Sequence, residues 1–142
     1  MRMSTKGRYG LRVMMELADR YGQGPVSVDA IARSQEISGN YIHLLVMGLR
    51  SAGLVRTVRG PSGGYELTRR PSSITALDVV SALEGRISPV DCVADADFCR
   101  RGARCVARDV WCEVAAAVDR VLSGLTLEQL ASRQQERRAD GR

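Results

Sequence analysis

The sequence predicts a mainly α-helical fold with one small β-hairpin, and three observations support this. Apolar residues recur at helical spacing between positions 39 and 50, a glycine-rich turn separates two runs of β-forming residues between 54 and 67, and valines recur at every fourth position from 106 to 118. Two short helices before such a hairpin are typical of a winged helix-turn-helix. A long apolar helix outside that unit needs a second surface to cover it. The expected fold is therefore a winged helix-turn-helix plus a long dimerisation helix.

The first helix is expected near the start of the chain, with Ser4 or Thr5 as its N-cap. Its apolar residues recur at four-residue steps, at Tyr9, Val13, Leu17 and Tyr21. The sequence Gly-Gln-Gly-Pro at 22–25 ends this helix, because glycine and proline interrupt helices. A short helix over 26–34 follows, with Ser27 as its cap, and 35–37 forms the turn to the next helix.

The second helix of the pair begins after Ser38, which can cap it, and ends at Gly53. One face is an apolar stripe that we expect to be buried, made of Ile42, Leu45, Val46 and Leu49. The opposite face carries polar or protruding groups, namely Asn40, Tyr41, His43, Leu44, Met47 and Arg50. The hairpin follows as strand 54–58, turn 59–64 and strand 65–67, and the glycines of the turn let its backbone lie close to another molecule.

Basic charge is concentrated in the half of the chain that holds these elements. Residues 1–70 contain 11 Lys or Arg against 5 Asp or Glu, whereas residues 71–142 contain 10 against 11. Double-stranded DNA would use this charge for phosphate neutralisation; the alternative is a solvated hairpin beside an ordinary basic surface. The candidate DNA-binding residues are Lys6, Arg8, Ser38, Asn40, Tyr41, His43, Leu44, Arg50, Arg56, Arg59, Gly60 and Ser62.

After the hairpin, Thr75 and Asp78 match a capping box for a helix over 76–84, which Gly85 closes. Thr126 and Gln129 match a second box, for a last short helix. Between them, a long helix over 106–122 carries a ladder of candidate dimerisation residues, Val106, Val110, Val114, Val118 and Val121. A symmetric homodimer on a palindromic operator would bury this ladder; the alternative is a helix folded back on its own domain.

These elements divide the chain into four parts. A winged helix-turn-helix DNA-binding domain is expected over 1–85, and a cysteine-containing, cluster-binding loop over 86–104. The dimerisation helix and the short C-terminal helix occupy 105–131. The polar residues 132–142 are expected to form a flexible tail.

Four cysteines, at Cys92, Cys99, Cys105 and Cys112, lie seven, six and seven positions apart. Thiols stay reduced in the cytoplasm, so metal binding or redox chemistry is favoured over disulfides. The short paired spacings of zinc sites are absent, and an iron–sulfur cluster held by a wrapped loop fits this pattern better. Buried core thiols, which suit Cys112 best, and a disulfide pair are the alternatives.

Six features of the sequence stand out together: Met1 to Tyr9, Ile37 to Tyr41, Gly53 to Val55, Val58 to Tyr65, the three loop cysteines and Leu125 to Leu127. In these features the chain resembles the Rrf family of bacterial winged-helix transcriptional regulators, which includes iron–sulfur and nitric-oxide sensors. The resemblance covers nearly the whole chain and implies a dimeric regulator whose loop cysteines bind a 2Fe-2S or 4Fe-4S cluster. Iron–sulfur members place a histidine shortly after the third cysteine, where this sequence has Arg108. The fourth ligand stays open among Cys112, Asp109 and a group from the partner subunit.

Other classes of protein fit the sequence poorly. It contains no phosphate-binding loop, nucleophile elbow or histidine–carboxylate metal motif, so we do not expect an enzyme. No apolar run has the length of a signal peptide or of a membrane span, and the expected location is the cytoplasm. The expected function is a DNA-binding regulator that senses iron–sulfur, redox or nitric-oxide status. The alternative is a regulator of the same fold without a cluster, acting by thiol oxidation or a protein partner, for example in cysteine metabolism.

Overall fold

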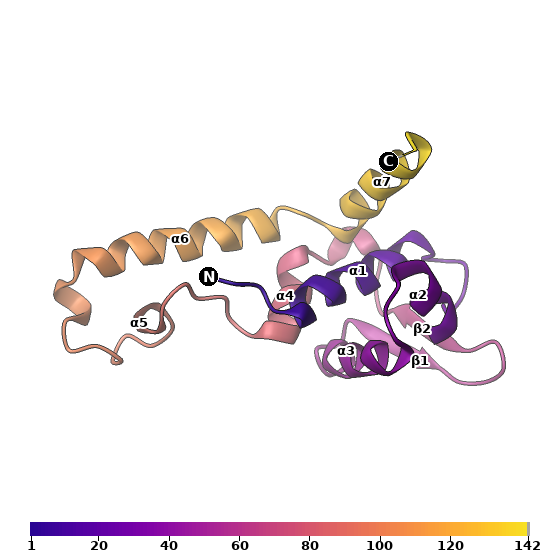
Figure 1. Ribbon diagram of the computed structural model, residues 1–142, viewed down its shortest axis with the longest axis horizontal. Helices are drawn as coiled ribbons and strands as arrows, with labels where there is room; N and C mark the ends of the chain where they lie inside the picture. The colour runs from indigo at the N-terminus through magenta and orange to yellow at the C-terminus, as the bar shows by residue number, and fades with distance from the viewer. Residues whose placement is uncertain (142) are drawn as a thin grey trace.

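The computed structural model describes residues 1–141, which form a helical body and one long arm (Figure 1). The described elements are, in chain order, α1 (Thr5–Asp19), α2 (Val28–Gln35), α3 (Gly39–Ser51), β1 (Val55–Val58), β2 (Gly64–Leu67), a 3₁₀ turn (Pro71–Ser73), α4 (Ala76–Glu84), α5 (Asp91–Ala94), a second 3₁₀ turn (Gly102–Arg104), α6 (Val106–Ser123) and α7 (Leu127–Ala139). The body comprises residues 1–85 and 124–141, and the arm comprises 86–123. The predicted mainly helical fold with one hairpin is confirmed.

Helix α1 is the centre of the body, because it packs against α2, α3, α4 and α7. Its Val13 and Met14 are completely buried. The predicted stripe on α3 is confirmed, since none of its members is more than 1% exposed: Ile42, Leu45, Val46 and Leu49. The predicted stripe on α1 was wrong at Tyr21, which is 47% exposed, because the helix ends at Asp19 and the chain then turns away.

Side-chain caps fix where the helices begin. In five cases the hydroxyl of the N-cap accepts a backbone N–H of the first turn, and these caps are Ser4, Ser27, Ser38, Thr75 and Thr126. Both predicted capping boxes are present. The two boxes also lie side by side, because Ala76 N–H donates to Leu125 over 2.8 Å and Leu127 N–H donates to Ile74 over 2.9 Å. The starts of α4 and α7 are therefore joined through their backbones.

The wing is a two-stranded antiparallel hairpin in which Val55 pairs with Leu67 and Val58 with Gly64. Gly64, with a φ of 159°, lies against the backbone of the segment that leads into α2. A Cβ added there would come within 2.1 Å of the Val26 carbonyl oxygen. Only glycine fits at this contact. The hairpin is thereby fastened to the segment just before α2.

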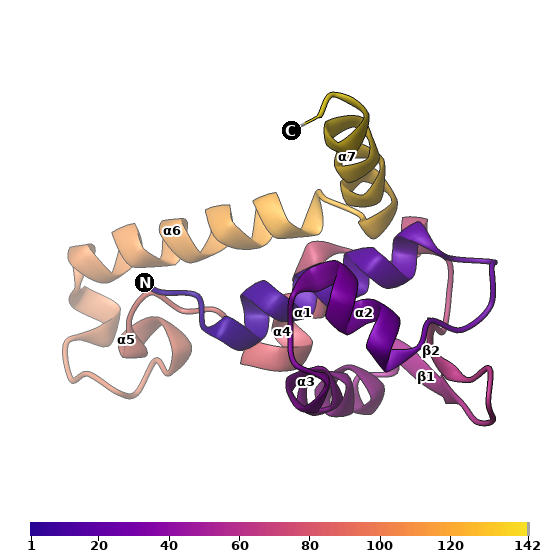
Figure 2. The same cartoon turned by 45° about the vertical axis from the view of Figure 1, so that its right-hand side comes forward.

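The arm projects from the body in both views (Figures 1 and 2). Helix α6 contacts α4 at one end and α5 at the other, yet Val93 and Ala115 are the buried apolar residues of the described arm. Part of the predicted ladder faces solvent, with Val106 76%, Val110 52% and Val121 59% exposed. None of the described helices is both long and apolar enough to cross a membrane.

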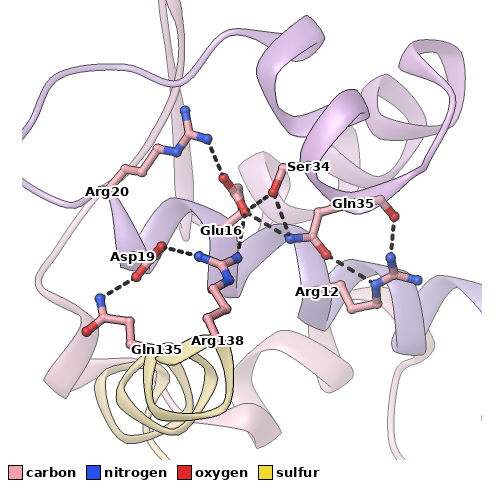
Figure 3. A network of polar contacts seen from close by, with 8 residues as sticks. All are labelled: Arg12, Glu16, Asp19, Arg20, Ser34, Gln35, Gln135 and Arg138. Atoms are coloured by element: carbon pink, nitrogen blue, oxygen red, sulfur yellow. Dashed lines mark hydrogen bonds and ion pairs between the residues drawn. The ribbon is translucent and has the colours of Figure 1, made fainter. Parts of the chain in front are cut away.

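The prediction of a flexible tail from 132 was wrong for most of that range, because α7 continues to Ala139. The helix packs on α1, with Leu127 completely buried and Ala131 7% exposed. Near its end, Gln135 and Arg138 both donate to Asp19 of α1 (Figure 3). These contacts order a polar segment that looked disordered from its composition alone. Residue 142 lies outside the described residues.

A buried carboxylate joins three helices of the body (Figure 3). Glu16 of α1 is only 2% exposed and accepts from Ser34 Oγ at 2.6 Å and from Gln35 Nε2 at 2.9 Å, both on α2. Arg20 pairs with the other carboxylate oxygen of Glu16 at 2.7 Å. Arg138 of α7 lies 3.9 Å from the oxygen that accepts from α2. A buried charge is tolerated where it is paired and hydrogen-bonded, as here. Glu16 therefore holds α2 on α1 through its hydrogen bonds, and it also lies near Arg138 of α7.

Candidate nucleic-acid interface and cysteine segment

The exposed face of α3 carries five of the six groups that the sequence predicted there, whereas Tyr41 is half-buried against Tyr9 of α1. Ser38 accepts the N–H of Tyr41 at 3.3 Å, so its side chain is used to start the helix. The exposed positions that follow are Asn40, His43, Leu44, Met47 and Arg50. Leu44 and Met47 are 48% and 65% exposed, whereas the opposite stripe is completely buried. Helix α3 thus presents one side to solvent and packs on the body with the other.

The wing lies on the same side of the body as α3 in both views (Figures 1 and 2). Arg59, Gly60 and Ser62 stand exposed in its turn. Arg56 differs, because its Nε donates to Glu66 Oε1 at 2.7 Å across the hairpin. Within residues 1–141, Arg59 takes part in no ion pair, so its charge is the more available of the two.

The start of α1 adds two exposed basic residues, Lys6 and Arg8. Arg8 and Arg12 lie over the ring of Tyr9 at 5.7 and 5.2 Å from its centroid. Tyr9 in turn meets Tyr41 of α3 edge to face, with centroids 5.9 Å apart. These contacts bring the start of α1 next to the start of α3. The sequence did not single out Arg12, which the structure places over Tyr9 and which also donates to Gln35 of α2.

Glu84, the last residue of α4, anchors the start of α1. Its Oε1 accepts the N–H groups of Ser4 and Gly7, each at 3.0 Å, and the hydroxyl of Ser4. A Cβ at Gly7 would come within 2.7 Å of this oxygen, so a larger residue there would displace the Glu84 carboxylate. Glu84 lies just before Gly85, the last residue of the body ahead of the arm. The basic start of α1 is therefore held close to the point where the cysteine-bearing chain leaves the body.

We define the cysteine segment as residues 86–112. The sequence suggested an irregular loop, whereas the structure places Cys92 on the short helix α5 and a 3₁₀ turn just before Cys105. Cys99 is exposed, the other three cysteines are partly buried, and all four are free thiols. Arg108 of α6 donates to the Cys92 carbonyl at 2.8 Å and so holds α5 against α6.

The donor chemistry of this segment suits an iron–sulfur cluster, since it offers four free thiols. Their arrangement does not yet form a binding site, because no three His, Cys, Asp or Glu side chains are gathered at one point in the described residues. Helix α6 begins at Val106, directly after Cys105. Cys105 and Cys112 are therefore separated by about 10 Å of rise along the helix axis.

A family model described as "Rrf2: Iron-dependent Transcriptional regulator" matches residues 3–133. The chain belongs to the Rrf2 family. Its members are DNA-binding transcriptional regulators rather than enzymes, as the sequence predicts, and they share the winged-helix fold described above.

Individual Rrf2 relatives support the same assignment. The HTH-type transcriptional regulator CymR of Bacillus subtilis is 46% identical over 132 residues, which cover 93% of this chain and 91% of CymR. The solved structure of that protein, described as the global cysteine regulator, has a TM-score of 0.79 at 44% identity, covering 93% of this chain and 97% of the other. The structure of T. potens IscR has a TM-score of 0.78 at 38% identity, covering 96% and 90%.

Proposed function

We propose that this Rrf2-family chain is a dimeric regulator that reads a palindromic operator with α3 and the wing and receives its signal through the cysteine segment. The observation that carries the proposal is the exposed basic and polar side formed by α1, α3 and the wing, seated on a completely buried core. It works in the cytoplasm, where its operator lies.

In the proposed complex, α3 enters the major groove and presents Asn40, His43 and Arg50 to base edges or nearby phosphates. Lys6 and Arg8 at the start of α1 contact phosphates, which positions the helix without reading sequence. Arg59 at the wing turn reaches the adjacent groove. Its lack of an ion pair within residues 1–141 and the open space around Gly60 beside it support this role.

The second part of the proposal is that α6 forms the two-fold interface. Its solvent-facing valines, Val106, Val110 and Val121, lie on the face turned away from Ala115, the buried residue of the helix, and a contiguous apolar surface of this kind is typical of an interaction site. A symmetric partner would cover the same face of both copies and place two copies of α3 on one operator.

The third part concerns the signal. The leading candidate is a 2Fe-2S or 4Fe-4S cluster held by Cys92, Cys99 and Cys105, supported by the free thiols and by the similarity to an IscR. The segment would have to close around such a cluster, because the side chains are not gathered in the described residues. The second candidate is a cluster-free regulator acting by thiol oxidation or a protein partner. The separation of the thiols in the described residues and the similarity to a cysteine regulator favour this second candidate.

DNA binding is tested by fluorescence anisotropy on a duplex selected from a randomised pool. Arg59→Ala should weaken binding by about 1–3 kcal/mol if it reads a base edge. The matched variant Arg56→Ala should lose less, because Glu66 already balances that charge. Affinity should fall steeply with salt. Equal and negligible losses for both variants would contradict the role of the wing.

The signal is tested by anaerobic purification with iron and sulfide analysis and visible absorption. A cluster would give bound iron, acid-labile sulfide and a coloured protein, and alanine at Cys92, Cys99 or Cys105 would abolish all three. Alanine at Cys112 would alter or weaken the spectrum if it is the fourth ligand. A colourless protein without iron or sulfide would rule out the cluster and leave the thiol or partner mechanism.

A further inference from the structure

A hydrogen bond joins the wing to the helix that we propose reads DNA. The Nδ1 atom of His43 on α3 lies 2.8 Å from the hydroxyl oxygen of Tyr65 on β2. The two rings meet edge to face, with centroids 6.1 Å apart and 78° between their planes. We propose that Tyr65 is a positioning residue that fixes the proton on the His43 ring and so decides which base edge His43 recognises. This inference rests on the proposed function, because it requires α3 in a DNA groove.

Tyr65 is the fixed member of the pair. Its side chain is 8% exposed and belongs to the core of the body. Its backbone N–H and C=O both bond to Val26, each over 2.9 Å, and it pairs with Thr57 on its other side. His43, in contrast, stands exposed on α3. The position of the hydroxyl is therefore set by the core, and the imidazole ring adjusts to it.

The chemistry of the two groups indicates where the proton lies. A neutral imidazole has one nitrogen that donates and one that accepts, and the partner of one nitrogen sets the role of the other. A phenol hydroxyl is a good donor and an unprotonated ring nitrogen is a good acceptor. Within residues 1–141 the Tyr65 hydroxyl has His43 as its hydrogen-bond partner and no other. We therefore assign the Tyr65 hydroxyl as donor to Nδ1, which leaves the proton on the exposed Nε2.

An Nε2–H group at this exposed position is a donor, so it selects bases with acceptors. Guanine presents two acceptors and no donor in the major groove, whereas cytosine presents a donor. We expect His43 to favour guanine over cytosine at the position that it faces. Without the Tyr65 hydroxyl the proton can move to Nδ1, and Nε2 can then accept from cytosine as well. Base selectivity at one operator position thus depends on a wing residue that itself needs no contact with DNA.

The proton position can be measured without DNA. His43 is the only histidine in the sequence, so nitrogen-resolved NMR of untagged protein gives one imidazole signal set. At about pH 8, where imidazoles are neutral, the wild type should show mainly the Nε2–H form. Tyr65→Phe keeps the buried ring and removes only the hydroxyl, and it should show a mixture of both forms. Equal populations of the two forms in wild type and Tyr65→Phe would overturn the inference.

The consequence for recognition is measured on a selected duplex and its single-base variants. The wild type should prefer guanine over cytosine at one position by about tenfold, and Tyr65→Phe should reduce that preference to about twofold or less. Tyr65→Phe added to His43→Ala should change nothing more, because both act through the same ring. Unreduced selectivity in a DNA-binding Tyr65→Phe protein would overturn this inference alone. Absence of sequence-specific binding by the wild type would instead overturn the proposed function, while the NMR result would still judge the proton position.

Discussion

The body and the arm differ in how far their apolar side chains are buried. In the body, the large apolar residues of α1, α3 and α4 meet one another, and many are completely buried. In the arm, α6 leaves Val106, Val110 and Trp111 between 42% and 76% exposed. The body therefore completes its core within one chain, whereas the arm presents a surface that a second chain can complete. This difference separates the part that holds the proposed reading helix from the part that would join two copies.

The largest expected effect is on the arm. Val110→Glu would place a charge in each half of the two-fold interface and should weaken association by about 3 kcal/mol or more. The body should stay folded, because Val110 is 52% exposed in the single chain. Light scattering should find monomers with an unchanged circular dichroism spectrum. Ala116→Glu adds the same charge to an exposed position off the ladder and should remain dimeric. A dimer mass for Val110→Glu would contradict the interface.

A somewhat smaller effect is expected in the core of the body. Leu49→Ala empties a completely buried site on α3 and should lower the free energy of unfolding by about 2–5 kcal/mol. Chemical denaturation measures this loss. Leu44→Ala on the same helix removes a side chain that is 48% exposed and should cost less than about 1 kcal/mol. Equal costs would show that the two faces of α3 do not differ in packing.

The next largest effect is expected from removing the buried carboxylate of Glu16. Glu16→Ala leaves Ser34 and Gln35 of α2 without their acceptor and should cost about 1–3 kcal/mol. Hydrogen exchange should rise strongly in α2, which loses two hydrogen bonds to Glu16, and slightly in α7, whose Arg138 lies 3.9 Å from the carboxylate. Glu136→Ala, at an exposed position of α7, serves as the control. Faster exchange confined to α2 would show that Glu16 does not hold α7.

The smallest effect is expected where the end of α7 meets α1 at the surface. Arg138 is 49% exposed and pairs with Asp19 at 3.0 Å, so Arg138→Ala should cost only about 0.2–1 kcal/mol and less at high salt. Thermal unfolding at low and high salt measures this difference. A loss above about 2 kcal/mol would mean that α7 is held by its ion pair rather than by the burial of Leu127 and Ala131.

Much of the local structure could be predicted because its causes lie within a few residues of one another. The caps at Ser27 and Ser38, both capping boxes and the buried stripe of α3 follow from side chains three or four positions apart. The hairpin follows from its turn residues. The exposed face of α3 could be named for the same reason, since it is what the stripe leaves outside.

The remaining features depend on contacts between distant residues, which no local pattern encodes. Asp19 meets Arg138 across 119 positions, and this contact belongs to a docked helix where composition suggested a loose tail. Ser4 meets Glu84 across 80 positions, and His43 meets Tyr65 across 22. The sequence alone thus determined the elements, the exposed face of α3 and the supply of thiols. The tertiary structure decided that α7 belongs to the body, that Tyr65 contacts His43 and that the cysteines stand apart, because each depends on which faces pack together.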